Sequence, residues 1–204
     1  MCNTFIQRPK KSADAWQARV NEAIARLKRS LVRKSDPAAV LVSDAGDLRP
    51  ALMRWGFHRP FNPSINNARS DKLAGSLWSP AFRERRCLIP ISSFFEWGPI
   101  PRGSKQAFEF HHVDDDWLWI AGLWEPSADY GDCFTMITTD APPVMAPIHD
   151  RMPAVLDLDP ALAFLTGELS DLRPYPGRLT VSACASPLKT KAKPPPDDSQ
   201  GLLF

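Results

Sequence analysis

Apolar residues recur at helical spacing in the first part of the chain. They lie three or four positions apart between residues 12 and 33: Trp16, Val20, Ala23, Ile24, Leu27 and Leu31. This period predicts an amphipathic helix over residues 12–33, with Ser12 available to cap its first turn. The opposite face carries five cations: Arg19, Arg26, Lys28, Arg29 and Arg33. We expect that face to be solvated, with DNA contact as the alternative.

The rest of the chain has mostly the pattern of short strands. Runs rich in β-branched and aromatic residues, bounded by Pro, Gly or Asp, occur at 38–43, 51–57, 87–97, 107–112, 117–125, 133–139, 153–157 and 179–184. Residues 71–86 are expected to be partly helical. Another short helix is expected near residue 160. Asp159 would cap it, Pro160 would lie in its first turn, and Gly167 would end it. The pattern predicts an α+β fold dominated by antiparallel β-sheet, with two or three helices.

Length and composition favour one domain. The 204 residues suffice for a single well-buried core, which we place at residues 1–186. Residues 187–204 are polar and proline-rich and are predicted to be a disordered tail. The chain has no run of about 18 apolar residues, as a membrane span requires, and its start lacks the apolar segment of a signal peptide. The net charge is only +2, so any affinity for DNA must come from a local patch.

The cysteines do not suggest a metal or a disulfide framework. The four of them lie far apart and form no CxxC pair: Cys2, Cys87, Cys133 and Cys184. We therefore expect a cytoplasmic protein with reduced thiols, no metal and no organic cofactor. Nothing in the sequence indicates more than a monomer.

Cys2 is the first candidate for chemistry. Once the initiator methionine is removed, Cys2 carries both an α-amine and a thiol. The α-amine has an ordinary pKa of about 7.7–8.0, against about 10.4 for Lys, so far more of it is neutral and nucleophilic near pH 7. Amine and thiol can condense with an aldehyde, first as a Schiff base and then as a thiazolidine ring. The alternative is a small terminal residue without a function.

Two titratable residues stand in contexts that suit proton transfer. His149 lies among prolines, Asp150 and Arg151, as expected of a functional loop. Glu96 ends an apolar run and is flanked by aromatics, so partial burial would raise its pKa toward neutrality. A hydrogen-bonded structural histidine and a carboxylate at a strand end are the alternatives.

A loop-like segment supplies donors for an anion. Asn67 and Arg69 are two residues apart and point the same way if the segment is extended. Their donors suit a phosphate or a sugar oxygen. The alternative is a turn with a surface ion pair to Asp71.

In combination these residues resemble the SOS-response-associated peptidase (SRAP) family, whose members shield abasic sites in single-stranded DNA. The matching segments occur in family order to about residue 190: Met1-Cys2, Arg54-Trp55-Gly56-Phe57, Asn67-Ala68-Arg69, Arg85–Pro90 with Phe95-Glu96-Trp97, Ala121–Glu125, Ile137-Thr138-Thr139 and Ala146–Pro153. The resemblance implies a SRAP-like domain and a covalent crosslink between Cys2 and an abasic site.

It also implies a role for each matching residue. Cys2 would be the nucleophile, and Asn67 would position the thiazolidine and the opened sugar. Glu96 would serve as the acid–base of Schiff-base formation and ring closure, and His149 would donate a proton that helps to open the sugar. Arg69 would bind a phosphate. Trp55 would stack at the DNA junction.

Further backbone contacts are expected from the basic residues of the matching segments. These candidates, together with Arg69, are Arg54, Arg85, Arg86 and Arg151. The sequence departs from the family at its start, where Asn3-Thr4 replaces the common Gly-Arg. An arginine that would contact DNA is thereby missing, while the chemistry at Cys2 is retained.

Two other functions compete with crosslinking. A thiol peptidase would pair Cys2 with His149, and it could act only in removing Met1. A non-catalytic module for single-stranded DNA would use the Arg and Trp residues and leave Cys2 idle. Neither accounts for all of the candidate residues.

The last residues suggest a partner. Gln200, Leu203 and Phe204 resemble the short peptides by which bacterial replication proteins bind the sliding clamp, a Gln first and a Leu-Phe pair last. A proline-rich linker would hold the apolar side chains of Leu203 and Phe204 away from the domain. The alternative is that these side chains pack on the protein's own core.

Overall fold

The computed structural model describes the chain except residues 1, 13, 45, 100–104, 178 and 189–204. The predicted clamp-binding residues Gln200, Leu203 and Phe204 therefore lie outside the described residues, as does most of the predicted tail. Within the described part of the chain, no helix is long and apolar enough to cross a membrane.

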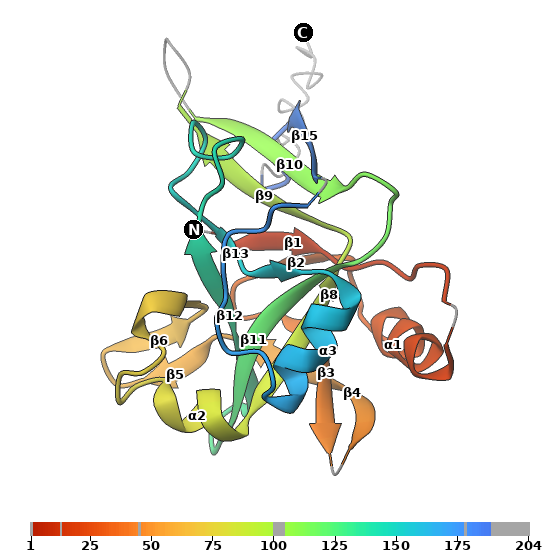
Figure 1. Cartoon of the computed structure of the whole chain (residues 1–204), viewed down its shortest axis with the longest axis vertical. Coiled ribbons are helices and arrows are strands. Elements are labelled where there is room, and N and C mark those ends of the chain that lie inside the picture. Colours follow the sequence, from red (N-terminus) through yellow and green to blue (C-terminus); the bar gives the residue numbers. More distant parts are fainter. Residues whose placement is uncertain (1, 13, 45, 100–104, 178, 189–204) are drawn as a thin grey trace, which may run out of the picture.

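Two sheets form the body of the protein, the five-stranded one above the eight-stranded one in Figure 1. The five-stranded sheet has the order β15-β10-β9-β1-β2 and is antiparallel throughout. Its strands are β1 (Thr4–Ile6), β2 (Leu31–Arg33), β9 (Ser93–Gly98), β10 (Gln106–His112) and β15 (Leu179–Cys184).

The eight-stranded sheet has the order β13-β12-β4-β3-β8-β11-β14, and β7 pairs with β12 beside this path. Its strands are β3 (Pro37–Asp44), β4 (Asp47–Trp55), β7 (Asn67–Arg69), β8 (Arg86–Ile91), β11 (Leu118–Ser127), β12 (Gly131–Asp140), β13 (Arg151–Pro153) and β14 (Val155–Leu156). A separate hairpin joins β5 (Phe57–Arg59) to β6 (Asn62–Ile65). The helices are α1 (Ala15–Ala25), the 3-10 turn η1 (Ser70–Lys72), α2 (Ser79–Glu84) and α3 (Leu158–Thr166).

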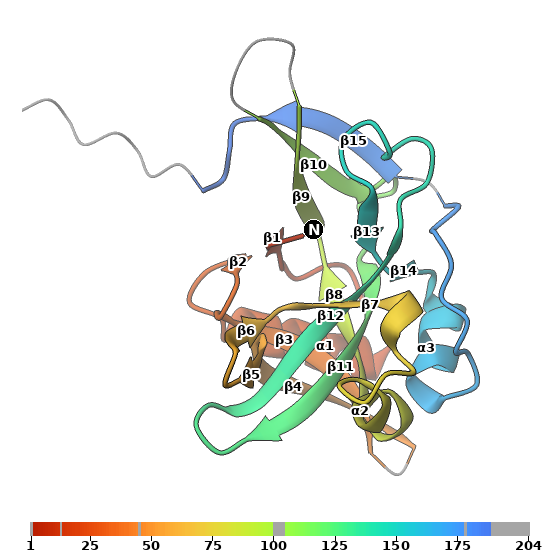
Figure 2. The same ribbon diagram turned by 90° about the vertical axis from the view of Figure 1, so that its left-hand side faces the viewer.

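Apolar side chains form two clusters. One lies between the sheets and holds Phe5 and Phe94 from the upper sheet and Trp55 and Phe134 from the lower. The other lies where α1 and α3 pack on the eight-stranded sheet (Figure 2). The predicted α+β class, rich in antiparallel sheet, is thus confirmed.

The helix expected over 12–33 is wrong in length. It ends at Ala25, and residues 31–33 instead form β2, which pairs with β1 so that Val32 lies opposite Phe5. Burial of Val32 between the sheets outweighs the helical period. The cap is also shifted, because Asp14 precedes the helix and its N–H donates to Gln17 Oε1.

The run 87–97 forms two strands rather than one. β8 and β9 belong to different sheets, and the chain bends at Ser92, whose N–H donates to the Ile6 carbonyl. The bend moves Glu96 into the upper sheet beside β1. The helix near residue 160 is capped by Asp157 rather than Asp159 and ends, as predicted, at Gly167, whose φ is +93°.

Candidate functional site

Cys2 lies two residues before β1 with its whole side chain buried. Two side-chain amides hold its backbone carbonyl: Asn67 Nδ2 donates to it at 2.9 Å and Asn66 Nδ2 at 3.3 Å. The Cys2 thiol in turn donates to the Thr4 carbonyl, with Sγ at 3.4 Å. Cys2 is therefore held at both its main chain and its side chain.

The electrostatics of this position keep the thiol protonated. Burial raises the pKa of the Cys2 thiol, and the nearby Glu96 carboxylate raises that pKa further. Glu96 lies on β9, the strand that pairs with β1, and its side chain is 2% exposed. Burial raises the pKa of Glu96 from 4.5 to about 7, so both of its protonation states are accessible near neutral pH.

His149 approaches from the loop between β12 and β13. Its Nδ1 accepts a hydrogen bond from the Arg151 N–H at 3.0 Å and lies 2.8 Å from Asp150 Oδ1. Nδ1 cannot make both hydrogen bonds at once: it accepts from Arg151 when it carries no proton and donates to Asp150 when it carries one. Burial lowers the pKa of His149, which favours the neutral ring.

Gly98 lets this loop lie against β9. A Cβ at Gly98 would be 3.3 Å from Ile148 Cα and 3.1 Å from the Phe108 ring, tighter than an ordinary contact. Because Gly98 has no side chain, Ile148, the residue before His149, can pack against β9, the strand that carries Glu96.

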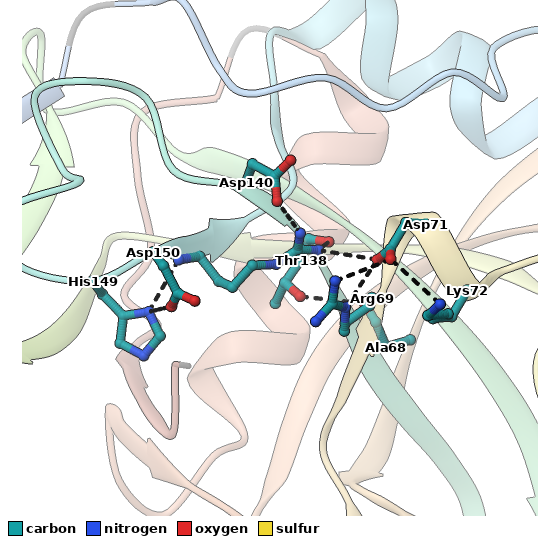
Figure 3. Close-up of polar contacts among 9 residues, drawn as sticks. Ala68, Arg69, Asp71, Lys72, Thr138, Asp140, His149 and Asp150 are labelled. Carbon is teal, nitrogen blue, oxygen red and sulfur yellow. Dashed lines mark hydrogen bonds and ion pairs between the residues drawn. The ribbon is translucent and has the colours of Figure 1, made fainter.

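A set of charged residues lies beside His149 (Figure 3). Arg69 ends β7, opposite Thr138 of the parallel strand β12, and its guanidinium makes two hydrogen bonds to Asp71, at 2.9 and 3.0 Å. Arg151 is buried, pairs with Asp140 and donates to the Thr138 carbonyl at 2.5 Å. The Arg69 side chain is 53% exposed, so it offers the accessible cation of this pair.

These groups surround one surface hollow. It is lined by Asn3, Asn66, Asn67, Arg69, His149, Asp150 and Arg151. The structure thus brings together four of the residues singled out in the sequence, Asn67, Arg69, His149 and Arg151, next to the buried pair Cys2 and Glu96. A second hollow, lined in part by Trp97 and Lys105, shares His149 and Asp150 with the first.

Trp55 does not lie where a junction-stacking residue must lie. It is fully buried, stacks on Phe134 at 6.2 Å between ring centroids, and donates from Nε1 to the Asn66 carbonyl at 2.8 Å. Its apolar rings fill the space between the sheets, so in this structure Trp55 is not accessible to a base.

Three predicted DNA-binding arginines are engaged away from the hollow. Arg54 lies opposite Cys133, at the other end of β12 from Thr138, where it donates to the Gly56 carbonyl and covers the Tyr130 ring. Arg86 donates to the carbonyls of Phe82, Phe164 and Leu169, which ties α2 and β8 to α3. Arg85 pairs with Glu84 at 2.9 Å. These contacts are within the protein, and a role for the three arginines in DNA binding stays a prediction.

Two residues of the site were missed in the sequence. Asn66 and Asn3 line the hollow, and Asn66 contacts the Cys2 carbonyl. The only available signal was that Asn66 precedes Asn67. Among the described residues, no group of three or more His, Cys, Asp or Glu side chains is arranged to hold a metal ion.

Fold and site together define a class: two-sheet α+β proteins with a cysteine at position 2, pinned by asparagine and set beside a buried glutamate and a loop histidine. The chain belongs to the SOS response associated peptidase (SRAP) family, whose model matches residues 1–185.

Relatives in the family carry names that refer to abasic sites. The chain is similar to the abasic site processing protein YoqW of Bacillus subtilis (strain 168), with 30% identity over 139 residues, 61% of this chain and 61% of that protein. It is also similar to the abasic site processing protein HMCES of Xenopus tropicalis, with 32% identity over 154 residues, 59% of this chain and 45% of that protein. The chain thus matches about six tenths or less of the length of these relatives.

Solved structures share the fold. A protein from Bordetella bronchiseptica superposes with a TM-score of 0.72 at 22% identity, covering 90% of this chain and 100% of that one. A protein from Bacteroides thetaiotaomicron gives a TM-score of 0.68 at 17% identity, covering 91% of this chain and 93% of that one.

Proposed function

We propose that this chain processes abasic sites by crosslinking to them in single-stranded DNA through a thiazolidine at Cys2, which protects the strand from breakage. One observation carries the proposal: Cys2 is pinned at its carbonyl by Asn67, beside Glu96, beneath a hollow that exposes Arg69. The names of the relatives point to the same substrate.

The chemistry needs no oxidant and no cofactor. Removal of Met1 frees the Cys2 amine, and the ring-opened abasic sugar presents an aldehyde at C1′. The amine adds to C1′, and the carbinolamine loses one water to give the imine. The Cys2 sulfur then adds to the imine carbon while the thiol proton passes to the nitrogen, which closes the five-membered ring.

Glu96 is the group placed to move these protons. With a pKa of about 7, its carboxylate can take a proton from the amine and its carboxylic acid can protonate the leaving hydroxyl. The same carboxylate can take the proton of the Cys2 thiol, whose raised pKa makes assistance necessary at the ring-closing step.

His149 and the arginines serve the sugar and the strand. Neutral His149 carries its proton on Nε2, since Nδ1 accepts from Arg151, and that proton can assist opening of the sugar. Arg69 is accessible to a phosphate, and Arg151 stands behind the same hollow. Asn67 Oδ1 is buried and has no hydrogen-bond partner among the described residues, so it can accept a bond from the sugar or the amine.

The burial of the Cys2 thiol argues against the peptidase alternative. A thiol peptidase requires a reactive thiolate, whereas burial raises the pKa of the Cys2 thiol. The non-catalytic alternative gives no reason to place a cysteine and a glutamate together beneath the hollow.

The test is a denaturing gel of the purified protein after incubation with single-stranded DNA that contains an abasic site. The wild type should give a denaturation-resistant adduct, Cys2→Ala should bind without an adduct, and a protein extended before Cys2 should give none. An undiminished adduct in Cys2→Ala would disprove the assignment. Cleavage of a peptide substrate, lost in Cys2→Ala and unaccompanied by any adduct, would favour the peptidase.

We infer a partner and an assembly state as well. Gln200, Leu203 and Phe204 would bind the replication sliding clamp, with Leu203 and Phe204 each contributing about 1.5–3 kcal/mol before ordering costs. We also propose a monomer, because nothing in the sequence indicates a larger assembly. Calorimetry of a peptide covering 195–204 against the clamp tests the partner. We expect a dissociation constant in the micromolar range for such a peptide. No binding at about 100 μM would therefore rule out the clamp as a partner. Sedimentation tests the monomer.

A further inference from the structure

The side chain of Asn66 contacts Cys2 but has no role in the proposed chemistry. Asn66 is 8% exposed, and its backbone carbonyl accepts two hydrogen bonds. The Asn66 carbonyl accepts from Trp55 Nε1 at 2.8 Å and from the Met136 N–H at 3.1 Å. The buried Trp55 therefore anchors the segment from which the Asn66 side chain reaches the N-terminus.

Both contacts of the Asn66 amide lead to the N-terminal residues. Its Nδ2 donates to the Cys2 carbonyl at 3.3 Å and to Asn3 Oδ1 at 2.9 Å. An amide nitrogen carries two protons, so both are used and the amide plane cannot rotate without losing a bond. Asn3 thus fixes the orientation in which Asn66 meets Cys2.

The consequence falls on the amine of Cys2. The Cα of Cys2 bears the carbonyl, the thiol-bearing side chain and the nitrogen. The carbonyl is held by Asn66 and Asn67, and the thiol by the Thr4 carbonyl. With two substituents fixed, tetrahedral geometry fixes the direction of the third. The amine is thereby oriented before the aldehyde arrives, which lowers the entropic part of the barrier.

We propose that Asn3 and Asn66 form a positioning relay that orients the Cys2 amine for attack. The relay rests on the proposed crosslinking function, and it acts through the hydrogen bonds of Asn66 to Cys2 and Asn3. It gives Asn3, an exposed residue at the rim of the hollow, a role in positioning Cys2.

The test separates orientation from binding. We would measure the rate of adduct formation at saturating abasic DNA, and the affinity for DNA carrying a tetrahydrofuran analogue that cannot react. Asn3→Ala should slow adduct formation about three- to tenfold, the effect of losing one hydrogen bond. Affinity and melting temperature should not change. Asn3→Asp, which keeps an acceptor oxygen, should restore the rate.

Two further variants sharpen the result. Asn66→Ala should slow the reaction at least as much, and adding Asn3→Ala to it should cause no further loss, because both act through one relay. Asn62→Ala, which removes the acceptor of the Ser64 N–H in the β5–β6 hairpin, is the matched control and should react at the wild-type rate. A wild-type rate in Asn3→Ala, additive losses, or a loss of affinity for the analogue would each overturn the relay.

A second assay distinguishes failure of the relay from failure of the proposed crosslinking function. If the wild type forms no adduct with DNA, the rate at which Cys2 forms a thiazolidine with formaldehyde, followed by mass spectrometry, still reports on the relay. A slower reaction in Asn3→Ala than in the wild type would support the relay without the DNA function. Equal rates would overturn it.

Discussion

At the scale of single residues, burial decides what each titratable group can do. Cys2 and Glu96 share one buried site, where the thiol stays protonated and the carboxyl titrates near neutrality. The sequence predicted the shifted Glu96 from the apolar run before it. It could not predict that Trp55 is buried, because tryptophans in cores and on surfaces have the same local sequence pattern.

The raised pKa of Glu96 should affect stability as well as rate. Between pH 4.5 and about 7 the folded state keeps a proton that the unfolded state has released. The contribution of Glu96 is therefore fully present below pH 4.5 and is lost as the pH rises through about 7, by about 3 kcal/mol in all. Urea unfolding should show Glu96→Gln matching the wild type at pH 4.5 and exceeding it at pH 8. Equal stabilities at pH 8 would contradict this.

Arg69 and Arg86 should respond differently to alanine. Arg69→Ala should weaken DNA binding and reduce the log–log salt slope by about 0.7, the value of one phosphate contact on a single strand. Arg86→Ala should leave both unchanged but cost about 2 kcal/mol of stability, because three carbonyls lose a charged donor. Fluorescence anisotropy at several salt concentrations, together with thermal unfolding, distinguishes the two. A smaller salt slope in Arg86→Ala would show that Arg86 binds a phosphate of the DNA.

At the scale of elements, the pattern predicted most strands and missed the bends between them. The run 87–97 reads as one strand because its apolar character is continuous, yet Ser92 divides it between two sheets. That bend places Glu96 beside β1, and no local signal marks it. The over-long helix has a related cause, since Leu27 and Leu31 continue the helical period while Val32 finds its partner on a distant strand.

The close approach at Gly98 should matter for chemistry more than for folding. Gly98→Ala adds a methyl that Ile148 can accommodate only by moving a few tenths of an ångström, at a cost of about 1 kcal/mol. The same movement carries His149 away from its place, so adduct formation should slow about tenfold. Single-turnover kinetics and thermal unfolding measure the two effects. Gly131→Ala, at a position with no atoms within 4 Å of the added carbon, controls for a general effect of such a change, although its φ of +70° adds local strain.

At the scale of the whole molecule, charge and topology restrict how DNA can bind. The chain has a net charge of only +2, and only Arg69 and Arg151 among the predicted arginines line the hollow. The sequence singled out candidate residues that the structure brings to the hollow, because their order matched a family. It could not sort the arginines, because their separation depends on the tertiary fold: Arg54 and Arg69 lie at opposite ends of β12, and Arg86 lies on β8.

The salt dependence of binding should therefore be shallow. Two phosphate contacts on a single strand give a log–log slope of about −1.4. Five arginines would give about −3.5 by the same rule. Titrations between 50 and 300 mM salt measure the slope directly. A slope near the steeper value would mean that Arg54, Arg85 or Arg86 leaves its carbonyl or carboxylate partner to bind DNA.

The enclosure of Cys2 has a consequence for oxidative stress. Peroxides attack thiolates, and they need access to the sulfur. The Cys2 side chain is fully buried and its pKa is raised, so it is protected on both counts. Preincubation with hydrogen peroxide should leave adduct formation intact at doses that oxidise an unfolded control, and early loss of activity would refute this. Under the proposed function, the protein would then keep its reactive group while oxidants are present, because the burial that would slow ring closure also excludes peroxide.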